Sequence, residues 1–214
     1  MAPPAFVRAV SYGVYEGTMR LALHALKYDR MVAVARELGS RLAEAMTQLA
    51  ADAPAEMLVV PVPLHRMRIA QRGFNQARTL AAEALQILRR SHPDWGLELS
   101  SSSLVRQRAT ESQAGLTPRQ RRLNLRGAFF VSDSEAVRGR HILLVDDIYT
   151  TGATARACSR TLIEAGAASV RVATLARAQR RVPLIIQDGR KYVRLTVPED
   201  AEKDTATSNS VTIH

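Results

Sequence analysis

The pattern of apolar and polar positions predicts strands that alternate with helices. Residues 57–62, 142–145 and 170–175 are short, strongly apolar runs, and between them apolar residues recur at helical spacing. A run that is apolar on both faces is typical of a strand in a parallel sheet that helices cover on each side. The sequence therefore predicts an α/β fold, with a central, mostly parallel sheet of about five strands and helices on both faces.

Four helices are predicted from apolar stripes with a period of 3.6 residues. Residues 1–12, ahead of the first helix, are expected to form a lead-in strand or arm, and Gly166 is the expected C-terminal cap of the last helix. The inward-facing residues are, in chain order, Tyr15, Met19, Ala22, Leu23 and Leu26; Leu38, Leu42, Met46 and Leu49; Leu80, Ala84, Leu85 and Leu88; and Ala157, Cys158, Thr161, Leu162 and Ala165.

The C-terminal part of the chain has a different pattern. Residues 182–187 and 191–197 are two β-prone runs around Asp188 and Gly189, a strong hairpin signal. Residues 199–214 are polar and show no periodicity, which predicts a disordered tail. The expected organisation is a domain at 1–178, a β-hairpin extension at 179–198 and the tail at 199–214.

The chemistry expected at the end of the run 142–145 is that of a sugar phosphate site. In parallel sheets, ligands collect beyond the carboxyl ends of the strands. Asp146 and Asp147 suit sugar hydroxyls or a magnesium ion, and the small residues after them would offer hydroxyls and free backbone N–H groups at a helix start, which favours a phosphate. The alternative is that Asp147 caps a helix and Asp146 pairs with a surface arginine. The phosphate-binding candidates are Thr150, Thr151, Gly152, Ala153 and Thr154.

A second anion site is predicted after the run 57–62. Prolines at 61 and 63 end the strand, so the segment 61–77 is expected to leave the sheet as a loop. The loop carries Arg66, Arg68 and Arg72 ahead of a new helix opened by Asn75, an arrangement that suits a pyrophosphate. Lys27 could reach the edge of the same ligand, although a lysine whose stem covers apolar surface is the more ordinary interpretation.

The densest basic region is the segment 100–127, and it is predicted to be a flexible lid. From residue 106 to 118 it shows no periodicity, and Thr117 followed by Gln120 indicates a short helix start. Such a lid could close on pyrophosphate and exclude water, while a nucleic-acid-binding loop is the rival interpretation. Its charged residues are Arg106, Arg108, Arg119, Arg121, Arg122 and Arg126, against Glu111.

Composition narrows the class of protein. The 214 residues carry a formal net charge of +10, so anionic ligands are expected. A single cysteine, Cys158, excludes an internal disulfide framework and a multi-cysteine zinc site, and the five histidines show no ligand spacing. No basic segment precedes an apolar stretch at the N-terminus, and no run of about 18 apolar residues exists, so a cytoplasmic protein without membrane contact is expected.

The sequence VDDIYTTGAT at 145–154 resembles the 5-phosphoribosyl 1-pyrophosphate (PRPP) signature of the type I phosphoribosyltransferases. The segments HALKYDR and PVPLHRMRIAQRGFNQA resemble the ComF-like branch, named for a protein of bacterial DNA uptake. RQRATESQAGLTPRQRRLNLRGAF at 106–129 has that branch's residues in the same order: Arg106, Thr110, Gln113, Leu116, Arg122, Asn124, Ala128 and Phe129. The resemblance covers residues 12 to about 178.

The resemblance implies a magnesium- and PRPP-dependent phosphoribosyltransferase with an unidentified small-molecule acceptor. Asp146 and Asp147 would face the ribose hydroxyls and hold magnesium, and both would be catalytic together with Arg106 and Arg108. The alternative is a non-catalytic PRPP-sensing or nucleic-acid-associated protein of DNA uptake, with single-stranded DNA or the competence machinery as partner. A homodimer is a further expectation. The residues expected to bind PRPP are Thr150, Thr151, Gly152, Ala153, Thr154, Arg66, Arg72 and Lys27.

Members of this branch commonly carry a cysteine-rich zinc module ahead of the lead-in strand. This chain begins at about the point where such a module would end, so no zinc is expected here. A shorter form of the protein and a start codon placed too far downstream are both open alternatives.

Overall fold

The computed structural model describes residues 5–28, 32–108, 120, 125, 127–178, 184–187 and 190–193. The chain forms two compact units, Met1–Ala178 and Gln179–His214. The first unit holds a five-stranded sheet with its covering helices, and the second holds a hairpin.

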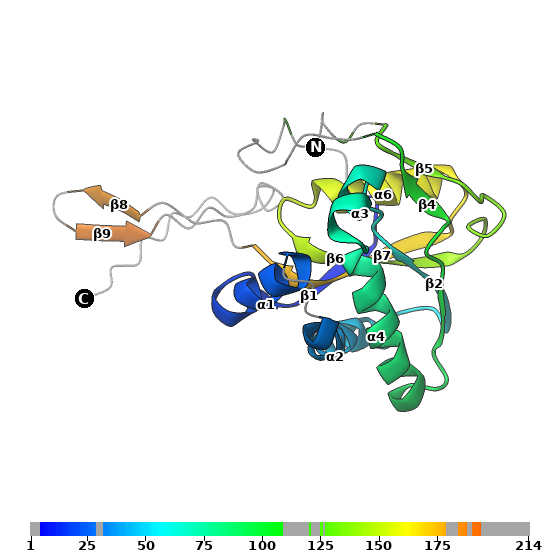
Figure 1. The fold of residues 1–214 in the computed structure, drawn as a ribbon, viewed down its shortest axis with the longest axis horizontal. Helices are drawn as coiled ribbons and strands as arrows, with labels where there is room; N and C mark the ends of the chain where they lie inside the picture. Colours follow the sequence, from blue (N-terminus) through cyan, green and yellow to red (C-terminus); the bar gives the residue numbers. More distant parts are fainter. Residues whose placement is uncertain are drawn as a thin grey trace, which may run out of the picture. The chain divides into compact units, whose positions relative to one another are not determined.

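The sheet of the first unit has the strand order β1-β7-β6-β2-β3, and every neighbouring pair is parallel (Figure 1). This confirms the predicted sheet and its predicted number of strands. Parallel strands bring their carboxyl ends to one edge, so the segments that follow β6, β7 and β2 emerge close together. The strands are β1 (Arg8–Val14), β2 (Glu56–Pro61), β3 (Gly96–Leu99), β6 (His141–Tyr149) and β7 (Ser169–Arg177).

Strand β6 is the middle strand of the sheet, and its apolar residues are buried on both faces. Leu143 and Val145 belong to one core cluster, while Ile142 and Leu144 belong to the other, and all four have no exposed surface. Alternate residues of a strand point to opposite faces, so both faces of this strand must be covered. The strand is longer than the predicted run, since it continues to Tyr149.

Helices cover the two faces separately. The first core cluster includes α1 (Gly17–Tyr28), α2 (Val32–Ala50) and α4 (Gln76–Ser91), and the second includes α6 (Ala153–Glu164). Figure 1 shows α2 and α4 on one side of the sheet and α6 on the other. The stripe predicted for α2 is confirmed, because its four inward residues are at most 3% exposed.

The segment after β2 is not the continuous loop that the prolines predicted. It contains a short helix, α3 (Arg66–Arg72), with His65 as its N-cap and Gly73 as its C-cap. The His65 Nδ1 accepts a hydrogen bond from Met67 N at 3.3 Å, and Gly73 takes the left-handed conformation (φ 82°) that ends helices. None of the helical residues is buried, so the sequence carries no apolar stripe that could reveal the helix.

The segment 100–127, predicted as a lid, contains a strand near its start. β4 (Leu104–Arg106) pairs antiparallel with β5 (Phe129–Val131), and Arg106 is in register with Phe129. The pairing is anchored in the second core cluster by Leu104 at 2% and Phe129 at 7% exposure. Residues 109–119, 121–124 and 126, including the predicted cap at Thr117 and most of the lid's arginines, lie outside the described residues.

The second unit contains the predicted hairpin. β8 (Leu184–Gln187) and β9 (Arg190–Val193) pair antiparallel, with Gln187 in register with Arg190. The turn residues Asp188 and Gly189 and the tail at 199–214 lie outside the described part of the chain. Among the helices that the structure describes, none is both long enough and apolar enough to cross a membrane.

Candidate functional site

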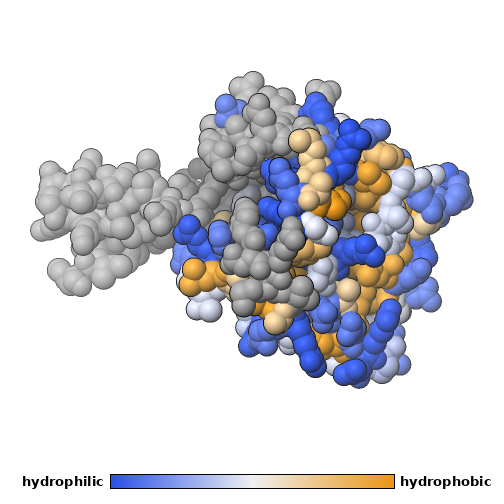
Figure 2. Space-filling view, in the orientation of Figure 1, coloured by the Kyte–Doolittle hydropathy of each residue, from blue (hydrophilic) through white to orange (hydrophobic). Residues whose placement is uncertain are grey.

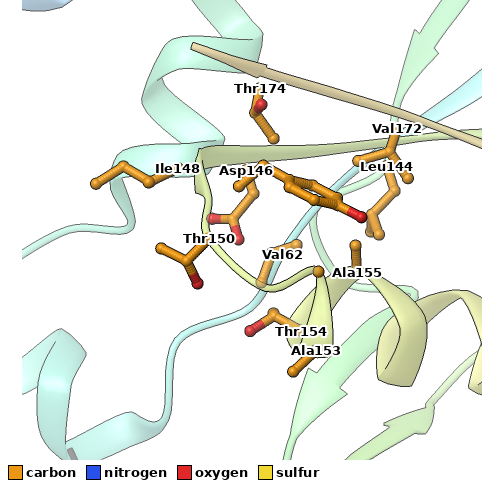
Figure 3. A pocket seen from close by; sticks show the side chains of 12 residues that line it. Val62, Leu144, Asp146, Ile148, Thr150, Ala153, Thr154, Ala155, Val172 and Thr174 are labelled. Atoms are coloured by element: carbon orange, nitrogen blue, oxygen red, sulfur yellow. The ribbon is translucent and has the colours of Figure 1, made fainter. Parts of the chain in front are cut away.

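A pocket lies at the carboxyl ends of β6 and β7 and the start of α6, where the sequence places the acidic and threonine-rich stretch (Figure 3). Strand β6 contributes one acid, the loop before α6 contributes hydroxyls, and the segment after β2 contributes an apolar wall. The lining residues are Val62, Leu144, Asp146, Ile148, Tyr149, Thr150, Gly152, Ala153, Thr154, Ala155, Val172 and Thr174.

The two adjacent acids have different surroundings. Asp146 lines the pocket and is half-buried. Asp147 is 5% exposed and forms an ion pair with Lys27 of α1, on the side of the sheet that carries the first core cluster. Successive side chains of a strand point to opposite faces, which accounts for the different partners of the two acids. In this structure the pocket therefore receives Asp146, while Asp147 is directed to a lysine from another part of the chain.

Burial raises the pKa of Asp146 well above its ordinary value, and the neighbouring Asp147 raises it further. Two interactions lower the pKa of Asp146 and so oppose this effect. The backbone N–H of Asp147 donates a hydrogen bond to Asp146 Oδ1 at 2.9 Å, and the positive charge of Lys27 favours the ionised carboxylate. The positive charge of Lys27 and this hydrogen bond therefore offset the effects of burial and of Asp147 only in part. A cation or a hydrogen-bond donor from a ligand would supply the remainder.

The loop before α6 depends on a glycine in contact with an aromatic ring. Gly152 takes the left-handed conformation (φ 70°) at the N-cap of α6, with no side-chain cap. A Cβ at this position would lie 2.2 Å from the Tyr149 hydroxyl oxygen. Only glycine fits both the backbone angle and the space. Tyr149 therefore packs closely against the loop directly in front of the helix.

The same loop presents groups that suit a phosphate. The first N–H groups of α6 precede its first intrahelical bond, which Arg156 N makes to Gly152 O at 2.9 Å. The Thr151 hydroxyl oxygen is buried and has no hydrogen-bond partner among the described residues. Figure 3 shows the carboxylate of Asp146 directed toward Thr150, and it shows Thr154 at the start of α6 on the same side of the pocket. The N–H groups and threonine hydroxyls are therefore hydrogen-bond donors that lie next to an acceptor, the carboxylate of Asp146.

Arg106, an arginine of the predicted lid, interacts electrostatically with the pocket acid Asp146. It is half-buried on β4, and its guanidinium carbon lies 5.5 Å from the centroid of the Phe129 ring. Burial lowers the pKa of Arg106, the charge of Arg68 lowers it further, and Asp146 and Cys158 oppose the shift. Arg106 and Arg68 are therefore close enough to influence each other. Arg68 was noted in the basic loop but was not among the predicted site residues.

The other predicted basic residues are more peripheral. Arg66 is exposed on α3, and Arg108 is exposed just after β4. Arg72 is half-buried and donates from Nη1 to Gln76 Oε1 at 3.2 Å. On the surface over α3 and α4, polar and apolar side chains are interleaved (Figure 2). None of these three arginines lines the pocket described above.

Thr174 is a lining residue that the sequence interpretation missed. It is in register with Asp146 on the adjacent strand, is 1% exposed, and its hydroxyl lies 2.7 Å from that of Ser11 on β1. Tyr149 was also missed, although it contacts Gly152 and lies 5.3 Å from the guanidinium of Arg177. Tyr149 lies within the signature at 145–154 but was given no role there, whereas Thr174 has no local sequence signal. Only the pairing of β6 with β7 could have placed Thr174.

The pocket lining contains one carboxylate, that of Asp146, which could take part in binding a magnesium ion shared with a ligand. Among the residues that the structure describes, no group of three or more His, Cys, Asp or Glu could hold a metal ion. Magnesium is usually bound by one or two carboxylates together with substrate phosphates and water. Asp146, on the pocket wall, could supply one such carboxylate.

Comparison with known proteins identifies the relatives of this chain. The family model described as "Phosphoribosyl transferase domain" matches residues 69–196. The DNA utilization protein YhgH of Escherichia coli O157:H7 is 33% identical over 177 residues, which cover 82% of this chain and 74% of the relative. Competence protein F of Haemophilus influenzae is 28% identical over 178 residues, covering 82% and 75%.

Competence protein ComFC of Bacillus subtilis is 38% identical over 122 residues, which are 56% of this chain and 45% of the relative. Among solved structures, a hypoxanthine phosphoribosyltransferase from Staphylococcus aureus covers 71% of this chain and 70% of its own, with 14% identity and a TM-score of 0.42. At that distance the likeness carries nothing about the site. On the family match and the curated relatives, the chain belongs to the ComF-like branch of the type I phosphoribosyltransferase family.

Proposed function

We propose that this protein binds magnesium and PRPP in the pocket at the end of β6 and transfers the phosphoribosyl group to an acceptor. The observation that carries the proposal is the position of Asp146 beside the loop that leads through Gly152 into α6. A sugar hydroxyl donor and a phosphate would meet an acceptor and a set of N–H donors within one pocket. Membership of the phosphoribosyltransferase family supports the same assignment.

Each residue has a distinct part in this proposal. The first N–H groups of α6 and the hydroxyls of Thr150, Thr151 and Thr154 would hold the 5-phosphate. Asp146 would accept a hydrogen bond from a ribose hydroxyl. Magnesium bound with the substrate would neutralise charge on the diphosphate.

The leaving diphosphate needs further positive charge as the bond to the sugar breaks. Arg106 is the best-placed candidate among the described residues, because its charge interacts with that of Asp146 and its ring contact with Phe129 orients it. Arg68 would add a second guanidinium nearby. The acceptor is a separate question, and a screen of nucleobases and small amines for release of pyrophosphate would address it.

Isothermal titration of the full-length protein with PRPP in the presence of magnesium tests the binding step. We expect the wild-type protein to bind, and the double variant Asp146→Asn with Asp147→Asn to lose binding while it keeps its circular dichroism spectrum. Asp94→Asn, an exposed acid in the turn before β3, is the matched control and should bind as the wild type does. An undiminished affinity in the double variant would remove PRPP from consideration.

A non-catalytic role with nucleic acid is the second candidate. The net charge of +10 favours it, and so do the relatives named for DNA utilization and competence. Binding driven by phosphate contacts weakens steeply with salt, because it releases condensed counterions. Titration with single-stranded DNA at 50 and 200 mM salt therefore separates the two candidates: strong, salt-sensitive DNA binding without PRPP binding would favour this role.

A further inference from the structure

The ion pair between Lys27 and Asp147 connects two distant parts of the chain at the candidate site. Lys27 lies near the end of α1, and Asp147 lies 120 positions later on β6. Their side chains are 16% and 8% exposed. Within the part of the chain that the structure describes, no other lysine or arginine pairs with Asp147. The pair is therefore largely withdrawn from water and depends on these two residues.

Burial makes each member of this pair dependent on the other. An uncompensated buried carboxylate costs several kcal/mol by general estimates, and removing one partner of a buried pair is far more damaging than breaking an exposed one. Lys27 is thus the charged partner of an acid that directly follows the pocket acid Asp146 in the chain.

We infer that Lys27 is the resident counter-cation of the acid pair: in the ligand-free protein it holds Asp147 on the α1 side of β6 and supplies the positive charge that a divalent cation supplies when a ligand is bound. The inference rests on the proposed function, because it takes Asp146 to be a magnesium ligand and Asp147 to be the acid next to it that adds negative charge. It assigns Lys27 a positioning role, whereas the sequence suggested direct contact with PRPP.

This role has a consequence for affinity. Two adjacent carboxylates without a lysine beside them attract a divalent cation more strongly than the same pair partly neutralised. Lys27 therefore lowers the affinity of the acid pair for magnesium alone. A bound cation would also weaken the attraction between Lys27 and Asp147, so the strength of the contact between α1 and β6 depends on whether the site is occupied.

The test uses full-length protein and magnesium chloride alone at pH 8, with thermal unfolding as the readout. Without magnesium, Lys27→Met should lower the melting temperature by about 5 to 10 °C, as expected for an unpaired buried charge. Magnesium should then raise the melting temperature of Lys27→Met at concentrations at least tenfold lower than for the wild type. Lys27→Arg should restore the wild-type response, and Arg20→Met, which removes an exposed charge from the same helix, should match the wild type.

Equal or weaker magnesium affinity in Lys27→Met would overturn the inference. If Lys27→Met does not fold, the double variant Lys27→Met with Asp147→Asn is tested next. Recovery of folding would show that the lysine serves to neutralise Asp147. Failure to fold would show that the lysine is needed only for packing, which would overturn the inference. Loss of PRPP binding in the wild type is a separate outcome. It would remove the proposed function, while the magnesium response of Lys27→Met concerns only the counter-cation.

Discussion

At the scale of single residues, the loop in front of α6 depends on the contact between Gly152 and Tyr149. The glycine has a φ of 70°, and the space beside its Cα is filled by the tyrosine hydroxyl and ring. A side chain at this position would meet two penalties, one from the backbone angle and one from the ring. The structure offers a way to separate them, because Gly139 has the same φ of 70° and nothing within 4 Å of a built Cβ.

Gly152→Ala is expected to weaken binding of magnesium and PRPP by at least tenfold, because the Tyr149 ring must move and the loop N–H groups move with it. Gly139→Ala should cost only the backbone strain, about 1 kcal/mol of unfolding free energy, and should leave binding unchanged. Isothermal titration and urea unfolding of both variants measure the difference. Equal losses of affinity at the two positions would show that the ring contact is irrelevant to the site.

The second residue-scale prediction concerns Asp146 and pH. Its pKa is raised in the folded protein, so the native state holds the proton more tightly than the unfolded chain does. Stability therefore falls as the pH rises above the ordinary aspartate pKa of 3.8, and below that value the group exerts no penalty because both states are protonated. Asp146→Asn removes the penalty.

Asp146→Asn should thus raise the unfolding free energy of the ligand-free protein at pH 8, because asparagine carries no charge that burial disfavours. The gain should shrink as the pH approaches 4. Urea unfolding at pH 4, 6 and 8 measures the trend, with Asp94→Asn as the exposed control. A gain that is the same at all three values would contradict the cause assigned to the shift.

At the scale of elements, Asn75 joins the segment after β2 to the start of α4. Its side-chain oxygen accepts from Ala77 N at 3.0 Å and Arg78 N at 3.4 Å, which caps α4. Its side-chain nitrogen donates to Val62 O at 3.0 Å. Since Val62 lines the pocket, the cap also fixes one wall of the candidate site.

Asn75→Ala is expected to cost about 1 to 2 kcal/mol of unfolding free energy, because both the cap and the bond to Val62 are lost. Asn75→Asp keeps the accepting oxygen but loses the donor, so it should fall between the alanine variant and the wild type. Chemical unfolding of the three proteins gives the order. An aspartate variant as unstable as the alanine variant would show that the bond to Val62, and not the cap, contributes most.

The elements also show what could be read from the sequence. The strands at 57–62, 142–145 and 170–175 and the stripes of α2 and α4 were predictable, because burial imposes a period on the apolar residues. Helix α3 was not, because it is short, buries no residue and follows two prolines. A pattern that arises from burial cannot reveal an element without a buried face.

The site divides in the same way. The loop from Thr150 to Gly152 and the acid of the pocket wall were predictable, since contiguous residues carry their own chemistry. The partner of Asp147 was not, because Lys27 reaches it only through the packing of α1. Thr174 likewise reaches the pocket through the register of β6 and β7. Contacts between distant segments follow from the fold, which local patterns do not specify.

At the scale of the whole molecule, the described site and the described core belong to the first unit. The two core clusters draw their members from residues 6 to 176, and every residue that lines the pocket lies between 62 and 174. The second unit begins at Gln179. The family match, however, extends to residue 196, which includes the hairpin. A truncated protein without the second unit therefore tests whether the hairpin is part of the folded binding domain.

A protein that ends at Ala178 is expected to fold cooperatively and to bind magnesium and PRPP as the full-length chain does, because it retains both core clusters and the entire pocket wall. Thermal unfolding and isothermal titration compare the two proteins directly, and single-stranded DNA titrated at low salt shows whether the second unit contributes to nucleic-acid binding. A sharp loss of PRPP affinity with an unchanged melting temperature would place a ligand contact in residues 179–214. A broad, non-cooperative transition would instead mean that the hairpin completes the domain, in agreement with the extent of the family match.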